Sequence, residues 1–298
     1  MKHEWTYLLG PLRLPFIILT PACVAVGVGS AIWSTGRVNG LFVVIVMIGA
    51  IAAHVSVNAF NEYFDFKSGL DFKTHRTPFS GGSGSLPARP ELAGHTLLIA
   101  VGTLVLTALV GVIFAVVWGM AILPLGILGL IVIVFYTPWI VRHPFMCLVA
   151  PGLGFGPLMV MGTDFALTGH YSCAAFAASL VPFFLVGNLL LLNQFPDSDA
   201  DRTVGRRHCP ITMGRRKSSY IYTLFLCAAY VSITGGVAFG VMPRATLMGL
   251  ATIILAVPAA AGAIYFADRT ERLVPFMTMN VAISVLTPFL VAVGFWWA

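Results

Sequence analysis

The chain has 298 residues, of which 58% are hydrophobic and only 9% are charged. Soluble domains contain roughly 25% charged residues, so this composition excludes an ordinary soluble enzyme. The formal net charge is +6, and its meaning depends on where the basic residues lie along the chain.

Long stretches without charge predict the membrane spans. A helix needs about 20 apolar residues to cross a hydrocarbon core of about 30 Å, and a charge near its centre is unfavourable. Seven stretches of this kind occupy residues 14–36, 38–61, 143–163, 165–196, 218–243, 245–267 and 273–298. The stretch 92–141 is long enough for two spans, with the turn predicted at Trp118-Gly119-Met120, before Pro124. The sequence therefore predicts an all-α integral membrane protein with nine transmembrane helices around a central cavity.

Lys and Arg collect on one side of the predicted spans. Of the 17 Lys and Arg residues, all except Arg37 and Arg244 fall in segments on the side of the N-terminus. Cytoplasmic loops are enriched in these residues, so we expect a cytoplasmic N-terminus and a C-terminus outside. The positive net charge then reflects membrane topology, and no nucleic-acid partner is expected. The first apolar run has no convincing cleavage site and is expected to remain as the first span.

Two polar segments at the inner ends of spans repeat the pattern Asn-x3-Asp. Asn61 precedes Asp65 in the first segment, and Asn193 precedes Asp197 in the second. The repeat suggests an internal duplication, with two four-helix units and a ninth helix in a single domain over residues 1–298.

The spacing within each segment predicts a column of oxygen ligands, because residues three or four apart share one face of a helix. The first column holds Asn58, Asn61 or Glu62, and Asp65, and the second holds Asn193, Asp197 and Asp201. Asp199 falls off the second stripe. Pro196 lies between members of the second column and is expected to kink or end its helix there.

These oxygens indicate a metal and phosphate site. Carboxylate and amide ligands without clustered His or Cys suit a hard cation such as Mg²⁺, which commonly bridges to substrate phosphates. Neighbouring basic residues are suited to phosphate binding, namely Lys67, Lys73, Arg76, Arg202, Arg206 and Arg207. The sequence has neither a Walker loop nor a GxGxxG fingerprint, so the pattern favours a Mg²⁺–diphosphate complex over a nucleotide.

The two segments resemble the Asp-rich motifs of the UbiA superfamily of intramembrane prenyltransferases. The first motif is similar to Asn61-Glu62-Tyr63-Phe64-Asp65 followed by Asp71 and Arg76, and the second to Asp197-x3-Asp201-x3-Gly205 followed by Arg206 and Arg207. The five residues between Asp65 and Asp71, and the stretches 136–138 and 154–158, look like the 1,4-dihydroxy-2-naphthoate branch. The sequence departs from the family at Glu62, where Asp is usual, at Phe195-Pro196, and in the glycine-rich run 77–84.

The resemblance implies Mg²⁺-dependent transfer of a prenyl group from a polyprenyl diphosphate to an aromatic acceptor, with 1,4-dihydroxy-2-naphthoate in menaquinone synthesis as the first choice. It implies metal binding by Asn61, Asp65, Asp71, Asn193, Asp197 and Asp201, with catalytic roles for the four aspartates. The six basic residues named above would bind the diphosphate. Asn58, Glu62, Tyr63 and His54 are further candidates, the last two near the acceptor. The implied location is the inner membrane of a bacterial or archaeal cell, among membrane lipid, with the active site facing the cytoplasm.

Other functions stay open. The acceptor is alternatively 4-hydroxybenzoate, another phenol or a lipid alcohol. A secondary transporter would instead place its polar residues near the bilayer midplane, and a catalytically silent lipid-binding relative is a third possibility because of Glu62. Each buried CH₂ contributes about 0.8 kcal/mol, so a prenyl tail is expected to stay in the bilayer and to leave the cavity sideways between helices. The loop Thr77–Pro87 is either a lid or a flexible connector.

Overall fold

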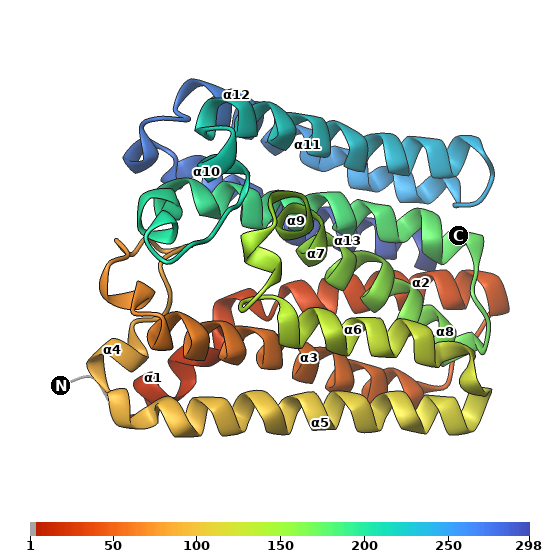
Figure 1. The fold of residues 1–298 in the computed structure, drawn as a ribbon. Helices are drawn as coiled ribbons and strands as arrows, with labels where there is room; N and C mark the ends of the chain where they lie inside the picture. The colour runs from red at the N-terminus through yellow and green to blue at the C-terminus, as the bar shows by residue number, and fades with distance from the viewer. Residues whose placement is uncertain (1–3) are drawn as a thin grey trace.

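Every regular element in the described part of the chain, residues 4–298 of a computed structural model, is a helix or a helical turn (Figure 1). The long elements are α2 (Leu19–Thr35), α3 (Gly40–Lys67), α5 (Ala93–Trp118), α6 (Leu123–Phe135), α7 (Pro144–Leu153), α9 (Cys173–Arg202), α11 (Arg215–Ala238), α12 (Ile253–Tyr265) and α13 (Val274–Trp296). Helix α7 continues through a π-helical segment, η7 (Gly154–Met161), into α8 (Gly162–Thr168), and η8 (Arg244–Thr252) leads into α12. The short elements are α1 (Glu4–Leu9), α4 (Ser85–Ala88), α10 (Cys209–Thr212), η1 (Gly10–Leu12), η2 (Leu14–Phe16), η3 (Leu70–Phe72), η4 (Pro90–Leu92), η5 (Met120–Ile122), η6 (Ile140–Arg142) and η9 (Thr270–Arg272).

The described residues contain eight helices that are long and apolar enough to cross a membrane. The remaining predicted span corresponds to a shorter apolar helix, Met120–Phe135, whose length of about 24 Å falls short of a hydrocarbon core of about 30 Å. The ninth transmembrane helix therefore stays a prediction. The all-helical membrane fold predicted from composition is confirmed.

The hairpin of α5 and α6 turns where the sequence predicts it. Gly119 has φ +90° and ψ 179°, a conformation that residues with a Cβ rarely adopt. Pro124 stands in the first turn of α6, where its missing N–H has no partner to lose.

Helix α9 passes through Pro196 and ends at Arg202. Of the two outcomes predicted at this proline, a kink or an end of the helix, the end is wrong, and a kink stays a prediction. The carbonyl oxygen of Phe195, the residue before the proline, accepts hydrogen bonds from the side chains of Ser198 at 2.7 Å and Arg215 at 2.9 Å. Because the helix continues, Asp197 and Asp201 lie on α9 itself.

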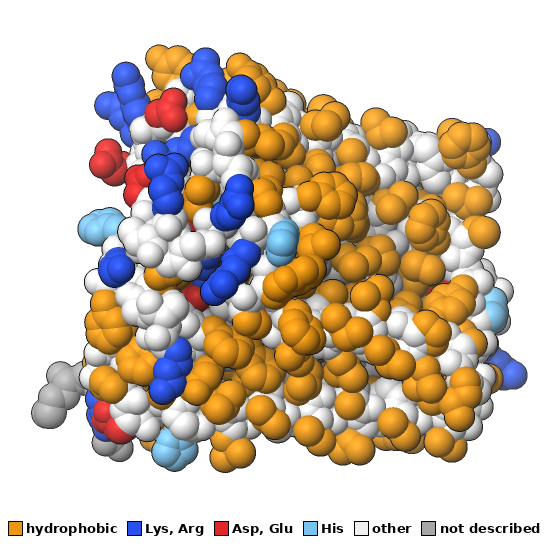
Figure 2. All heavy atoms as spheres, in the orientation of Figure 1, with side chains coloured by type: hydrophobic (Ala, Val, Ile, Leu, Met, Phe, Trp, Pro, Cys, Tyr) orange, Lys and Arg blue, Asp and Glu red, His pale blue; other side chains and the backbone are white. Residues whose placement is uncertain are grey.

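The two polar segments lie at the same end of the bundle. Figure 1 shows α1, the segment after α3 and the turn after α9 together at the left, whereas α13 ends at the right. Figure 2 shows Lys, Arg, Asp and Glu gathered at that left end, with a broad hydrophobic surface across the rest of this face. The charge asymmetry in the sequence therefore appears in the fold, while the cytoplasmic orientation of this end stays a prediction.

Candidate active site

The first polar segment reaches the site from the end of α3 and from the turn that follows it. Asn61 and Asp65 lie on α3, and Asp71 lies in η3. Asp65 and Asp71 are both buried, and both line a polar cavity of about 90 Å³ together with Asn61. The chain therefore turns back after α3, and this turn brings the carboxylates of Asp65 and Asp71 to the same cavity.

The second polar segment approaches the same cavity from α9. Asn193, Asp197 and Asp201 all line it, as the helical spacing predicts. Asp199, two residues from both Asp197 and Asp201, is exposed and forms an ion pair with Arg215 at 2.8 Å. The structure thus separates the three inward residues of α9 from the outward one.

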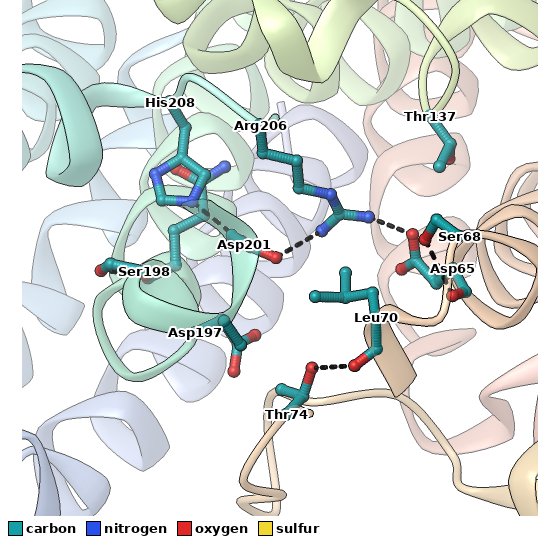
Figure 3. Close-up of polar contacts among 12 residues, drawn as sticks. Asp65, Ser68, Leu70, Thr74, Thr137, Asp197, Ser198, Asp201, Arg206 and His208 are labelled. Atoms are coloured by element: carbon teal, nitrogen blue, oxygen red, sulfur yellow. Dashed lines mark hydrogen bonds and ion pairs between the residues drawn. The ribbon is translucent and has the colours of Figure 1, made fainter. Parts of the chain in front are cut away.

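Arg206 joins the two segments (Figure 3). Its Nη1 donates to Asp201 Oδ1 at 3.0 Å, and its Nη2 donates to Asp65 Oδ1. Burial by itself would lower the pKa of this guanidinium, but the facing carboxylates of Asp65 and Asp201 raise the pKa above its usual range. A fixed positive charge therefore lies between aspartates that are 136 residues apart in sequence.

His208 is a cavity residue that the sequence analysis missed. Its Nε2 pairs with Asp201 Oδ2 at 2.8 Å, and its Nδ1 is buried with no hydrogen-bond partner. The side chain is 1% exposed and lines the polar cavity. The available signal in the sequence was its position directly after Arg207, the last residue of the second motif.

Glu62 lies behind the cavity, held by a second missed residue, Arg13. Arg13 Nε donates to Glu62 Oε1 at 2.9 Å, and the Glu62 side chain is fully buried. Glu62 Oε1 also accepts from the backbone N–H of Ser83 at 2.8 Å, and Oε2 accepts from the Ser83 hydroxyl at 2.8 Å. Of the two alternatives for the first column, Asn61 therefore shares the cavity with Asp65, and Glu62 anchors the loop that follows.

The loop Thr77–Pro87 closes over the polar cavity. Besides the Ser83 contacts, the N–H of Gly81 donates to Asp197 Oδ2 at 3.2 Å, so the loop is attached to both α3 and α9. At Gly82, which has φ +73°, a Cβ would lie 2.9 Å from Asp71 Oδ1. Glycine is thus needed for this close approach to the carboxylate.

The other predicted phosphate-binding residues lie outside the lining of the polar cavity. All five are exposed at the same end of the molecule, namely Lys67, Lys73, Arg76, Arg202 and Arg207. Lys73 Nζ donates to Thr203 Oγ1 at 3.4 Å, and Lys67 lies over the ring of Tyr63 at 5.7 Å. The structure brings Arg206 alone of the predicted set into the cavity.

A larger apolar cavity of about 470 Å³ adjoins the polar one. Six residues line both cavities, namely Arg13, Asn61, Phe79, Tyr136, Leu190 and Asn193. His54 and Asn58 line the apolar cavity, where the His54 ring pairs with Thr20 at 2.8 Å and the Asn58 amide donates to the carbonyl of Leu12 at 3.1 Å. Tyr63 lines neither cavity. A small polar cavity and a larger apolar cavity therefore lie side by side and share part of their lining.

The donor atoms in the polar cavity fit a hard divalent cation. Asp71 Oδ2, Asn193 Oδ1 and Asp197 Oδ1 are buried without hydrogen-bond partners, and all three residues line this cavity. Unpaired buried oxygens are unfavourable unless a cation or water reaches them. Burial, followed by repulsion from Glu62 and Asp65, raises the pKa of Asp71 to about 7. Within residues 4–298 no three or more His, Cys, Asp and Glu side chains are grouped closely enough to hold a metal ion by themselves.

The site therefore consists of carboxylates, amides and a buried arginine at one end of an apolar cavity, within an apolar helical bundle. Residues 20–296 match the UbiA prenyltransferase family. The chain therefore belongs to the UbiA prenyltransferase family and is an integral membrane prenyltransferase.

Two characterised relatives and two solved structures are similar to this chain. The 1,4-dihydroxy-2-naphthoate octaprenyltransferase of Bacillus subtilis is 26% identical over 84% of this chain and 76% of its own length. The 2-carboxy-1,4-naphthoquinone phytyltransferase of a Synechocystis species is 24% identical over 94% of this chain and 90% of its own length. A UbiA homologue from Aeropyrum pernix aligns with a TM-score of 0.68 at 17% identity, over 92% of this chain and 96% of the other. An Archaeoglobus fulgidus homologue bound to DMAPP and Mg²⁺ aligns with a TM-score of 0.64 at 15% identity, over 96% and 99%.

Proposed function

We propose that this protein transfers a prenyl group from a polyprenyl diphosphate to 1,4-dihydroxy-2-naphthoate, a step of menaquinone synthesis, in a bacterial or archaeal inner membrane. One observation carries the reaction class: two aspartate segments meet at a polar cavity that adjoins a larger apolar one. A prenyl diphosphate has the same division into a charged head and an apolar tail. The predicted topology directs the polar cavity toward the cytoplasm.

The polar cavity is the proposed site of the diphosphate. Asn61, Asp65, Asp71, Asn193, Asp197 and Asp201 are the proposed ligands of Mg²⁺. Bound there, the metal would neutralise the diphosphate and make it a better leaving group. Arg206 supplies a fixed positive charge inside the cavity, and the exposed Lys and Arg residues around it would attract the anionic head from water.

The chemistry consists of one bond broken and one bond formed. The allylic carbon–oxygen bond of the donor breaks, and both bonding electrons leave with the diphosphate. An electron-rich ring carbon of the acceptor then attacks the allylic cation. With a naphthoate acceptor, the ionised carboxylate on the attacked carbon departs as carbon dioxide, and the electrons of the broken carbon–carbon bond return to the ring. If the attacking ring carbon carries a hydrogen in place of a carboxylate, it would instead lose that proton to a carboxylate of the site or to the diphosphate.

The apolar cavity is the proposed site of the prenyl tail. Its walls are mostly apolar side chains of α3, α5, α6 and η7, and the tail would leave sideways into lipid. The loop Thr77–Pro87, attached to α3 and α9, would act as the lid that excludes water from the cation.

Similarity to two naphthoate-type enzymes over most of the chain favours the naphthoate acceptor. Acceptors of other classes, namely 4-hydroxybenzoate, another phenol or a lipid alcohol, are the alternative. A transporter is disfavoured because the carboxylates lie at the ends of α3 and α9 and in η3, away from the middle of the helices.

Three substitutions test the reaction class on purified protein. Asp65→Asn and Asp201→Asn remove charge from the polar cavity, and Asp199→Asn removes an exposed charge from the same helix as Asp201. We expect the first two to reduce Mg²⁺-dependent prenyl transfer by about 100-fold or more, since each removes a charge that acts on the leaving group. Asp199→Asn should keep wild-type activity. Equal activity in all three variants would contradict the assignment of the site.

The acceptor is tested separately by product mass. Wild-type protein is incubated with one donor and, in turn, with 1,4-dihydroxy-2-naphthoate, 4-hydroxybenzoate and a glyceryl phosphate. A decarboxylated prenyl naphthoate as the main product supports the proposal. A main product from another acceptor keeps the reaction class and replaces the acceptor, whereas solute flux into sealed vesicles without donor consumption supports a transporter.

A further inference from the structure

Three glycines that line the apolar cavity, Gly111, Gly126 and Gly154, have no atom within 4 Å of a built Cβ, and the first two belong to the α5–α6 hairpin. Gly111 lies on α5 and Gly126 lies on α6. They lie almost equally far from the turn at Gly119, one on each arm of the α5–α6 hairpin. The first atom of a side chain at either position would therefore stand at the cavity wall without touching a neighbouring helix.

The depth of this glycine pair follows from contacts between α5 and α3. Thr107 Oγ1 donates to the carbonyl of Gly49 at 3.4 Å, and a Cβ on Gly49 would lie 2.8 Å from Val110. Gly111 is thus at the level of Gly49, which lies about 18 Å along α3 from Asn61 at 1.5 Å per residue. An extended chain gains roughly 1.2 Å per bond, so an isoprene unit of about four chain bonds spans about 5 Å, and about four units reach the pair.

The cavity meets the outer surface beside the same glycines. Val112 and Ile127, the next residues along α5 and α6, line the cavity while remaining 53% and 54% exposed. In the membrane this surface faces lipid tails. A chain that is longer than the cavity would therefore leave past Gly111 and Gly126.

We propose that Gly111 and Gly126 determine the length of prenyl chain that the enzyme accepts. The glycines keep the distal part of the cavity wide enough for a long tail to pass into lipid, whereas a short tail ends before it reaches them. The inference rests on the proposed function, because it assigns this cavity to the tail of the donor.

The test compares Gly111→Leu and Gly126→Leu with a control in the same helix. Gly102 on α5 is exposed, lies outside the cavity lining and also has no atom within 4 Å of a built Cβ, so Gly102→Leu makes the same chemical change on the outer surface. Leucine is a better helix former than glycine, so the substitutions should not weaken either helix. Purified variants are assayed with one acceptor and with geranyl, farnesyl and octaprenyl diphosphates.

We expect both cavity variants to keep geranyl transfer within about twofold of wild type and to lose about tenfold or more in kcat/KM with the octaprenyl donor, the scale on which a filled apolar pocket discriminates. Gly102→Leu should match wild type with every donor. Equal ratios of long-chain to short-chain activity in all proteins would overturn the inference, as would equal loss with both donors in the cavity variants. Failure of the wild-type protein to consume any prenyl diphosphate would instead refute the proposed function.

Discussion

The two polar segments have similar sequences but different surroundings. The second is a single helical stripe, in which Asn193, Asp197 and Asp201 all reach the cavity from α9. The first is divided: Asp65 lies on α3, Asp71 lies on the turn after it, and Glu62 points away to hold Arg13 and the loop at Ser83.

This difference shows that a repeated spacing does not imply a repeated role. The extra length of the first segment allows one carboxylate to anchor a loop while two others face the cavity. The second segment has no comparable loop, and Arg206 and His208, which follow it, instead pair with its last aspartate. An ancestral duplication stays a prediction. Substitutions of Arg206, Glu62 and His208 test the difference between the two segments, because these residues make the contacts in which the segments differ.

The largest effect on stability is expected at Arg206, the residue that joins the two segments. Arg206→Met leaves the buried carboxylates of Asp65 and Asp201 facing each other without a cation. Removal of one partner from a buried ion pair destabilises a protein by about 3–5 kcal/mol. Thermal unfolding in detergent, without divalent metal, should therefore begin at a clearly lower temperature than in wild type.

Arg216→Gln is the matched control, because it removes an exposed arginine from the start of α11. It should unfold like wild type. If Arg206→Met and Arg216→Gln have the same melting temperature, the buried pair does not hold the two segments together.

A smaller effect is expected at Glu62, the residue that distinguishes the first segment. Glu62→Gln keeps the shape of the side chain but weakens its bonds to Arg13 and Ser83. Loss of a hydrogen bond to a buried charged group costs about 1–3 kcal/mol. We expect faster limited proteolysis within the loop Thr77–Pro87.

The double variant Arg13→Gln with Glu62→Gln should be less destabilised than the sum of the single variants, because the two residues act as a pair. Glu91→Gln, which affects an exposed pair with Arg89, should leave the proteolysis rate unchanged. Additive effects of Arg13→Gln and Glu62→Gln would show that the pair is not coupled.

The smallest effect is expected at His208, which contacts the second segment. His208→Leu removes the partner of Asp201 Oδ2, and loss of a group that orients a metal ligand typically reduces activity or metal affinity by about 10–100-fold. We expect a loss of about tenfold in prenyl transfer, with a higher Mg²⁺ concentration needed for half-maximal activity.

His208→Gln, which retains a side-chain donor, should recover most of this loss. His170→Leu, at an exposed histidine after α8, should behave as wild type. An unchanged Mg²⁺ requirement in His208→Leu would remove the positioning role.

The sequence alone determined the membrane fold and the residues that line the site from α3 and α9. The length of a charge-free stretch can be compared directly with the thickness of the bilayer, and residues three or four apart share a helix face. The membrane spans and the site-lining residues could therefore be predicted from local sequence patterns. The turn at Gly119 was predictable for the same reason, since its conformation depends on glycine itself.

Only the tertiary structure decided how these residues are paired. Arg13 and Glu62 are 49 residues apart, and Asp65 and Arg206 are 141 residues apart, so no spacing rule relates them. Helix periodicity left Asn61 and Glu62 as alternatives, and the packing of α3 against the loop decided between them. The apolar cavity and its two glycines likewise depend on how α3, α5 and α6 pack, because the space between helices is a property of their arrangement and not of any one segment.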